Sequence, residues 1–138
     1  MNTRAYSTLQ YEIASLADSA TTLVPGTACK ITKLPVSPIT TYSNNFYAVA
    51  ACKAGDVVNG VVSLKGGITD STDGRLVLLN AGFIPVLLNA TLKKGQYVKP
   101  ATSGKWDEGM AGDVVFAELM EDGAKDTLVW ARPDIKTI

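Results

Sequence analysis

From Val24 onward, short runs of β-branched and apolar residues alternate with turn signals made of glycine, proline and Asp-Gly. Turn residues at intervals of about ten residues are typical of a small barrel or sandwich. The sequence therefore predicts an all-β fold, a small β-barrel or sandwich domain over residues 24–138. The expected strands cover residues 27–34, 46–50, 57–64, 75–79, 83–88, 97–100, 114–119 and 127–131. The side chains expected in its core are Leu76, Leu78, Val86, Leu88, Val98, Val115 and Val129.

One local pattern occurs three times, at residues 53–58, 94–98 and 111–115. In each copy, glycine and a polar residue precede a β-branched pair or an alternating run. Glycine tolerates the positive φ of a tight turn, so a strand can leave immediately after it. The unequal intervals exclude a solenoid and indicate recurrent turns at the rim of a barrel.

Residues 1–23 differ from the rest because they contain no glycine or proline and are rich in Ser, Thr and Ala. Their apolar residues fit both helical spacing and strand alternation. We expect an extended N-terminal arm over residues 1–23 that lies on another surface; the alternative is a first strand or helix packed on its own domain. The residues expected to bind through this arm are Tyr6, Leu9, Tyr11, Ile13 and Leu16.

Composition excludes several kinds of chemistry. The chain has no histidine, which excludes Ser-His-Asp and Cys-His catalysis and histidine-ligated metals. Thirteen basic residues balance thirteen acidic ones, so no strong basic field exists to attract nucleic acid or an anionic membrane. No signal peptide or membrane-spanning apolar run is present, and we expect a soluble protein made in a cytoplasm.

The remaining candidate sites are weak. Asp70 and Asp73 lack the ligand spacing of a calcium loop, and Asp107 and Glu108 follow a turn signal, which predicts exposed loop acids. Cys29 and Cys52 are predicted to be reduced and buried, with a disulfide between paired strands as the alternative. We expect no enzyme activity, no metal and no cofactor.

Several segments occur in an order that is specific as a set. Pro25-Gly26-Thr27 opens the series, followed by Ala54-Gly55-Asp56, Gly60-Val61-Val62, residues 92–101, Ser103-Gly104-Lys105, residues 111–118 and residues 128–131. In this order, residues 24–132 resemble the capsid decoration, or cement, proteins of tailed bacteriophages. That family tends to read G-V-V, then I-K-K-G-D-Y-V-x-P-A-x-D-G, then G-V-A-L-E and a final apolar strand. This chain departs from the pattern at Gln96, at Phe116 and in a longer segment over residues 35–48.

The resemblance implies a structural virion protein on the capsid exterior, made in the bacterial host cytoplasm. It would bind the major capsid protein and stabilise contacts between its subunits, and it would self-associate as a trimer on the shell. Nucleic acid and membrane are not expected partners, and the family has no catalytic residues to transfer. The alternative is a carbohydrate- or ligand-binding β-module on a phage surface or fibre, which would expose a cluster of aromatic side chains.

Overall fold

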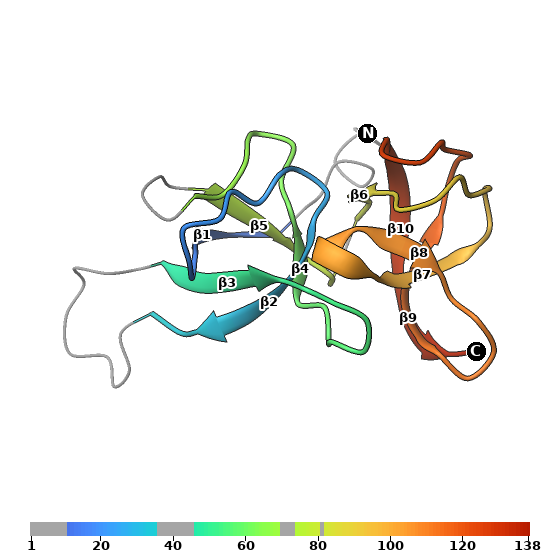
Figure 1. Ribbon diagram of the computed structural model, residues 1–138, viewed down its shortest axis with the longest axis horizontal. Helices are drawn as coiled ribbons and strands as arrows, with labels where there is room; N and C mark the ends of the chain where they lie inside the picture. The colour runs from blue at the N-terminus through green and yellow to red at the C-terminus, as the bar shows by residue number, and fades with distance from the viewer. Residues whose placement is uncertain (1–10, 36–45, 70–73, 81) are drawn as a thin grey trace, which may run out of the picture.

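The computed structural model describes residues 11–35, 46–69, 74–80 and 82–138. These ranges contain strands and one short 3-10 turn, so the all-β prediction is confirmed (Figure 1). No helix among them is long and apolar enough to cross a membrane. The elements are β1 Glu12–Ala17, β2 Ala28–Lys33, β3 Tyr47–Ala51, β4 Gly60–Val62, β5 Gly74–Leu78, β6 Ile84–Leu87, β7 Tyr97–Pro100, η1 Thr102–Gly104, β8 Trp106–Glu108, β9 Val114–Leu119 and β10 Leu128–Thr137.

The first five strands form a closed barrel in the order β1-β3-β2-β4-β5. β1 closes it by pairing parallel with β3 and antiparallel with β5. The remaining pairs are antiparallel. Alternate side chains point inward because successive residues of a strand face opposite sides. The interior is filled by Ala17, Leu23, Cys29, Val49, Val62, Ile68 and Leu76.

The place of β1 corrects one part of the predicted arm over residues 1–23, namely residues 12–17. Glu12–Ala17 are a strand of the barrel, with Ser15 and Ala17 buried and Ile13 packed against the interior. Of the helical spacing and the strand alternation that the sequence allowed, the strand is the one formed. Without β1, β3 and β5 would each keep an unpaired edge. Residues 1–10, and with them Tyr6 and Leu9, lie outside the described residues.

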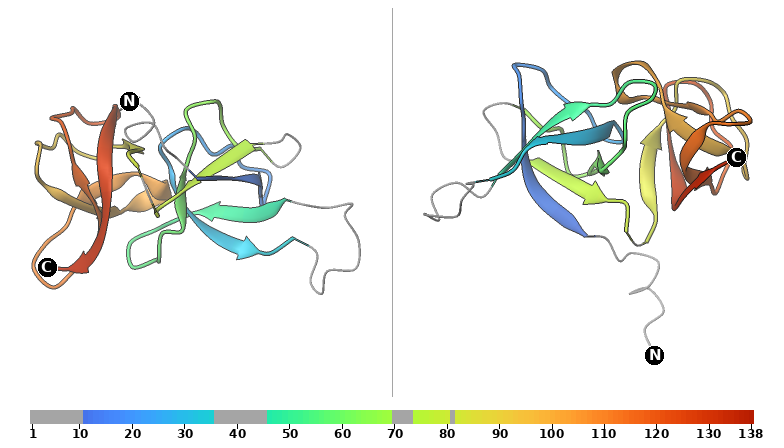
Figure 2. Two further views of the ribbon diagram at one scale, coloured as in Figure 1. Left: turned by 180° about the vertical axis from the view of Figure 1, so that it is seen from behind. Right: turned by 90° about the horizontal axis from the view of Figure 1, so that it is seen from below.

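The other five strands form a second sheet in the order β6-β10-β9-β7-β8. A parallel bridge between Leu88, just after β6, and Trp106 in β8 brings its two outer strands together. Figure 2 shows this sheet curling beside the barrel as a separate lobe. Its interior holds large apolar side chains, among them Val86, Val98 and the fully buried Trp106.

The two sheets are the same structure built twice, with β1–β5 corresponding in order to β6–β10. The five pairings in the barrel have counterparts of the same direction in the second sheet, including the parallel contact Ala17–Val49, which corresponds to Leu88–Trp106. The chain is therefore a tandem structural repeat. We call β1–β5 the first repeat and β6–β10 the second repeat.

The register matches as well as the topology. The turn before β2 and the turn before β7 are closed by equivalent hydrogen bonds: the Gly26 N–H donates to the Val62 carbonyl at 2.9 Å, and the Gly95 N–H donates to the Leu119 carbonyl at 2.8 Å. Residue pairs across the strands also match. The pair Cys29–Gly60 between β2 and β4 corresponds to Val98–Ala117 between β7 and β9. The pair Ile31–Val49 between β2 and β3 corresponds to Pro100–Trp106 between β7 and β8.

The repeats are joined by an apolar face of the first repeat. Its outward side chains are buried in one cluster with the interior of the second repeat, which makes a continuous core. Hydrogen bonds also cross the junction. The Gly26 carbonyl accepts from the Trp106 indole N–H and from the Leu87 N–H, both at 3.1 Å, and the Gly104 N–H donates to the Cys52 carbonyl at 2.7 Å. The residues that form this face are Ala28, Cys52, Val58, Val61 and Val77.

The equivalent face of the second repeat carries charged residues. Glu118 and Arg132 occupy the positions of Val61 and Val77, whereas Tyr97, Gly109 and the buried Val115 occupy those of Ala28, Cys52 and Val58. Glu118 and Arg132 form an ion pair of 2.7 Å.

Residues 134–138, which we call the terminal segment, include the end of β10, which pairs with β9, and they place side chains on this face. The Lys136 ammonium lies 3.8 Å from the centroid of the Tyr97 ring, and the Ile138 side chain lies beside Gly109. The terminal segment thus covers a surface that, in the first repeat, packs on a neighbour.

The core prediction is confirmed for Leu76, Val86, Leu88, Val98, Val115 and Val129, which are buried, whereas Leu78 is only half-buried. These side chains belong to two repeats rather than to one barrel.

We expect Leu76→Ala to lower the free energy of unfolding by about 2–5 kcal/mol, because the fully buried side chain leaves a cavity in the first barrel. Leu64→Ala is the matched control, because Leu64 is exposed, and it should cost less than about 0.5 kcal/mol. Urea unfolding of both variants measures the difference. Equal small losses would contradict the assigned interior.

Candidate docking surface

Of the residues predicted for an arm, the three that the structure describes do not gather into a site. Tyr11 is exposed just before β1, Ile13 packs against the barrel interior, and Leu16 is half-buried. Tyr6 and Leu9 lie outside the described residues. A role of these five residues in capsid binding stays a prediction.

The carboxylates expected in a loop after residues 103–105 lie instead on β8. Glu108 accepts a hydrogen bond from the Gln96 side chain at 2.8 Å, and Asp107 accepts one from the backbone N–H of Glu108 at 3.0 Å. Both carboxylates are therefore engaged by neighbouring groups. No group of three or more potential metal ligands occurs among the described residues.

Each repeat contains the same five-residue string, Ala-Gly-Asp-Val-Val, at residues 54–58 and 111–115. Gly55 and Gly112 both have φ of +91°, and a Cβ at either position would meet open space. The turns close in the same way, with the Asp56 N–H donating to Lys53 and the Asp113 N–H donating to Met110. We call these two segments the twin turns.

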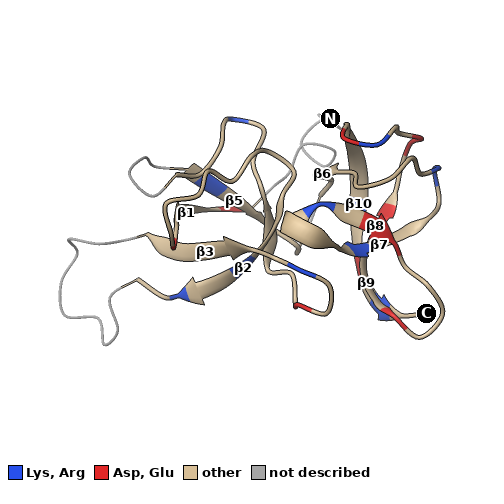
Figure 3. Cartoon of the chain, viewed as in Figure 1, with Lys and Arg blue, Asp and Glu red and all other residues tan. Residues whose placement is uncertain are grey.

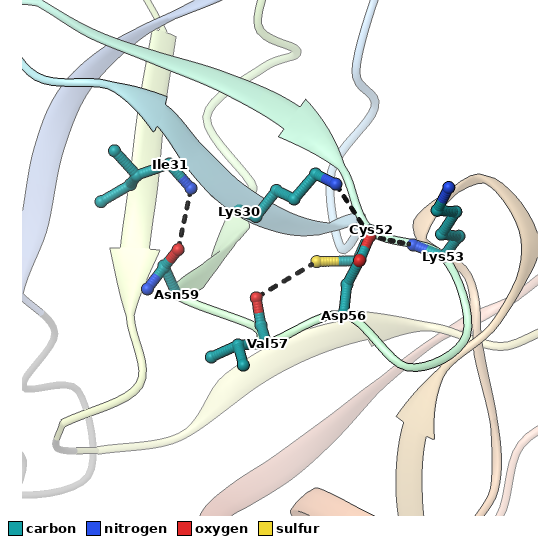
Figure 4. A network of polar contacts seen from close by, with 7 residues as sticks. All are labelled: Lys30, Ile31, Cys52, Lys53, Asp56, Val57 and Asn59. Carbon is teal, nitrogen blue, oxygen red and sulfur yellow. Dashed lines mark hydrogen bonds and ion pairs between the residues drawn. The ribbon is translucent and has the colours of Figure 1, made fainter.

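The aspartate of the first turn is held by two donors (Figure 4). Its Oδ2 accepts from the Lys53 backbone N–H at 3.0 Å and from the Lys30 ammonium at 3.1 Å. Both interactions favour the charged carboxylate, so the pKa of Asp56 is lowered, first by the Lys53 N–H and then by Lys30. Lys30 lies on β2, so this ion pair ties the turn to a strand.

The second turn repeats this arrangement with different flanking residues. Asp113 Oδ2 accepts from the Lys99 ammonium at 2.7 Å and from the Met110 backbone N–H at 2.8 Å. The pKa of Asp113 is lowered, first by the Lys99 hydrogen bond and then by the Met110 N–H. Lys99 on β7 is the structural equivalent of Lys30 on β2.

Further contacts fix the first turn against its barrel. The Cys52 thiol donates to the Val57 carbonyl at 3.7 Å, and Asn59 Oδ1 accepts from the Ile31 N–H at 2.8 Å (Figure 4). The turn is therefore attached at both of its ends, which fixes the direction in which Val57 points.

A groove of about 240 Å³ lies between the twin turns. Both turns extend from the lower side of the molecule in the view of Figure 1. Val57 is 67% exposed and Val114 is 49% exposed, although the next residue in each turn, Val58 or Val115, is buried. The lining residues are Gly55, Asp56, Val57, Lys99, Pro100, Gly112, Asp113, Val114 and Phe116.

The sequence predicts both segments as rim turns but does not indicate that they lie side by side. Their shared string was the available signal, because identical residues at equivalent places of a repeat adopt the same conformation. Charged residues of both signs are spread over both repeats (Figure 3), which fits the absence of a basic field.

The two cysteines are free and buried, as predicted. Cys29 points into the first barrel and Cys52 into the core shared by the repeats, so the thiols belong to different clusters. Burial raises the pKa of Cys52 to about 12 and also raises the pKa of Cys29. Neither thiol is in the ionised state that reacts as a nucleophile or binds a metal.

No protein-family model matches the chain, and no curated protein matches it either. A solved structure does match: the head fiber gp8.5 N base in bacteriophage phi29, with a TM-score of 0.68 and 8% sequence identity. The match covers 94% of this chain and 98% of that chain. The two chains share a fold. At this identity the likeness is one of architecture, and it extends over both repeats because it covers nearly the whole chain.

We expect the carboxylates of the twin turns to contribute to acid sensitivity. Their folded-state pKa values are lowered, so their stabilising effect is complete above the unfolded value of about 3.9 and is lost as pH falls through the folded values. In an Asp56→Asn/Asp113→Asn double variant, unfolding free energy should fall less steeply between about pH 5 and pH 2. Urea unfolding across this range measures it. Identical pH profiles would show that the ion pairs contribute nothing.

The two buried thiols predict a loss of stability at alkaline pH. Their folded pKa values are raised, so stability is complete below the unfolded value of about 8.5 and is lost as pH rises above it. Each thiol adds a slope of up to about 1.4 kcal/mol per pH unit. A Cys29→Ala/Cys52→Ala variant should lose this slope, and the native protein should resist a thiol reagent until it unfolds. Rapid labelling of the native protein would contradict the burial.

Proposed function

We propose that the chain is a structural protein of a phage virion that binds the capsid exterior and stabilises contacts between major capsid protein subunits. The observation that carries the proposal is the shared fold with a phage head fiber base over nearly the full length of both chains. The resemblance of residues 24–132 to phage decoration proteins supports the same assignment from the order of its motifs.

The proposed role is mechanical rather than catalytic. The chain contains no histidine, and its cysteines are held as protonated thiols by burial. A protein that binds only the assembled shell stabilises that state relative to the dissociated one by linkage. Each copy contributes little, but many copies act together on one shell.

The exposed side chains support a carbohydrate-binding function less well than the proposed capsid-binding function. The exposed large apolar side chains of the described residues include only two aromatic ones, Tyr11 and Trp130, and these lie in different repeats. Stacking on a sugar requires aromatic side chains presented together on one face, so these two residues do not supply such a platform.

Trimer formation on the shell is also part of the proposal, and it rests on the family resemblance alone. The mass of the free protein in solution, measured by light scattering, and the number of copies per capsid subunit test it separately. A copy number that does not fit groups of three would remove the trimer but leave the binding role in place.

The proposal predicts that the purified protein co-sediments at a fixed ratio with expanded, DNA-free capsids of the phage that encodes it. Saturated capsids should resist heat better than bare ones, because bound protein favours the assembled state. The measurement is the temperature at which capsids break, followed by light scattering, at increasing protein concentrations.

Serum albumin at the same concentration is the control for nonspecific protection. If the wild-type protein does not bind expanded capsids, the proposed function is wrong. If it binds but bound and bare capsids break at the same temperature, the stabilising role is wrong and a display role replaces it.

A further inference from the structure

We propose that the groove between the twin turns is the surface that docks on the shell, and that it receives a capsid-subunit segment with an apolar side chain flanked by lysine or arginine. This inference rests on the proposed function and names the contact through which it would act. The groove is a different binding surface from the N-terminal arm over residues 1–23 that the sequence predicts.

The first argument is the exposure of two equivalent valines. In each Val-Val pair the second residue is buried and explains its own apolar character, whereas Val57 and Val114 remain largely in solvent. The residue before the shared Ala-Gly-Asp-Val-Val sequence differs between the two turns: it is Lys53 in the first and Met110 in the second. The packing of either repeat does not require an apolar side chain at the exposed position, yet both repeats present one.

More apolar surface lies next to the second turn. Met110 is exposed at the start of this turn, and Ile138 is partly exposed where its backbone pairs with Gly112 and Asp113. Exposed apolar groups gathered at one place, rather than scattered singly, mark binding surfaces.

The second argument is the set of hydrogen-bond acceptors in the groove. Asp56 and Asp113 both use Oδ2 for their lysine and for a backbone N–H. Among the described residues, neither Oδ1 atom receives a hydrogen bond. The lowered pKa values keep both groups ionised. Each aspartate is already paired with a lysine, Lys30 or Lys99, so the carboxylates give the groove no excess of negative charge. What they offer an occupant is one Oδ1 acceptor each beside an apolar strip, which fits a segment whose lysine or arginine donors flank an apolar side chain.

The third argument is continuity with the interface between the repeats. Pro100 and Phe116 line the groove, and Phe116 also belongs to the core shared by both repeats. A ligand in the groove would therefore extend an existing apolar contact. The surface is preorganised, because both turns are fixed by ion pairs to strands, and this reduces the entropy lost on binding.

The test uses the full-length protein and expanded, DNA-free capsids. We expect Val57→Ser/Val114→Ser to weaken capsid binding by roughly tenfold or more, with each single variant intermediate. Val24→Ser is the matched control, because Val24 is also exposed but does not line the groove, and it should bind as the wild type does. Thermal unfolding of each free variant shows whether the fold is kept.

A charge variant tests the chemistry of the occupant. Asp56→Asn/Asp113→Asn keeps an oxygen that can accept the turn hydrogen bonds but removes both negative charges. It should weaken binding, and it should flatten the decrease in wild-type affinity with added salt. An unchanged salt dependence would contradict a basic occupant.

Three outcomes separate the hypotheses. If the wild type does not bind capsids, the proposed function fails, and the inference fails with it. If the wild type and the double valine variant bind equally well, the groove is not the docking surface although the function stands. A variant that lacks residues 2–10, and so keeps β1, completes the comparison. If it alone loses binding, the arm is the docking element and the groove inference is overturned.

Discussion

The carbonyl oxygen of Gly26 is the point on which the relation between the two repeats depends. It accepts hydrogen bonds from the Leu87 backbone N–H and from the Trp106 indole, both at 3.1 Å, so one atom of the first repeat holds two strands of the second. Gly26 has φ of +82°, and a Cβ there would lie 2.3 Å from the Leu128 side chain. The equivalent Gly95 has open space around it. The same turn thus serves as a junction in one repeat and as a surface loop in the other.

Much of the fold follows from local sequence signals. Glycine turns followed by β-branched residues predicted the strands around Val61, Val98 and Val115, because these signals act over a few neighbouring residues. β1 was not recognised, since it has a buried Ser15 and its pairing partners lie far along the chain. Closure of a barrel is a long-range constraint that no single segment carries.

The duplication was hidden for a related reason. The copies of the rim-turn pattern at residues 53–58 and 111–115 are equivalent positions of two repeats, whereas the copy at residues 94–98 corresponds to the turn at Gly26. Interior residues of the repeats differ widely in size, with Trp106 in the place of Val49. The groove between the twin turns is not evident from the sequence, because it exists only where the two turns lie side by side. Only the packing of the repeats, and not the sequence of either one, brings them together.

The terminal segment has a consequence for how copies of this chain meet. The repeats stack head to tail, and an arrangement of this kind has no internal limit: open-ended contacts of the same type build fibres. In this chain the equivalent face of the second repeat has different contacts. Glu118 and Arg132 replace the apolar Val61 and Val77, and Lys136 and Ile138 cover what remains. Another barrel that packed there, as the second repeat packs on the first, would have to displace these contacts.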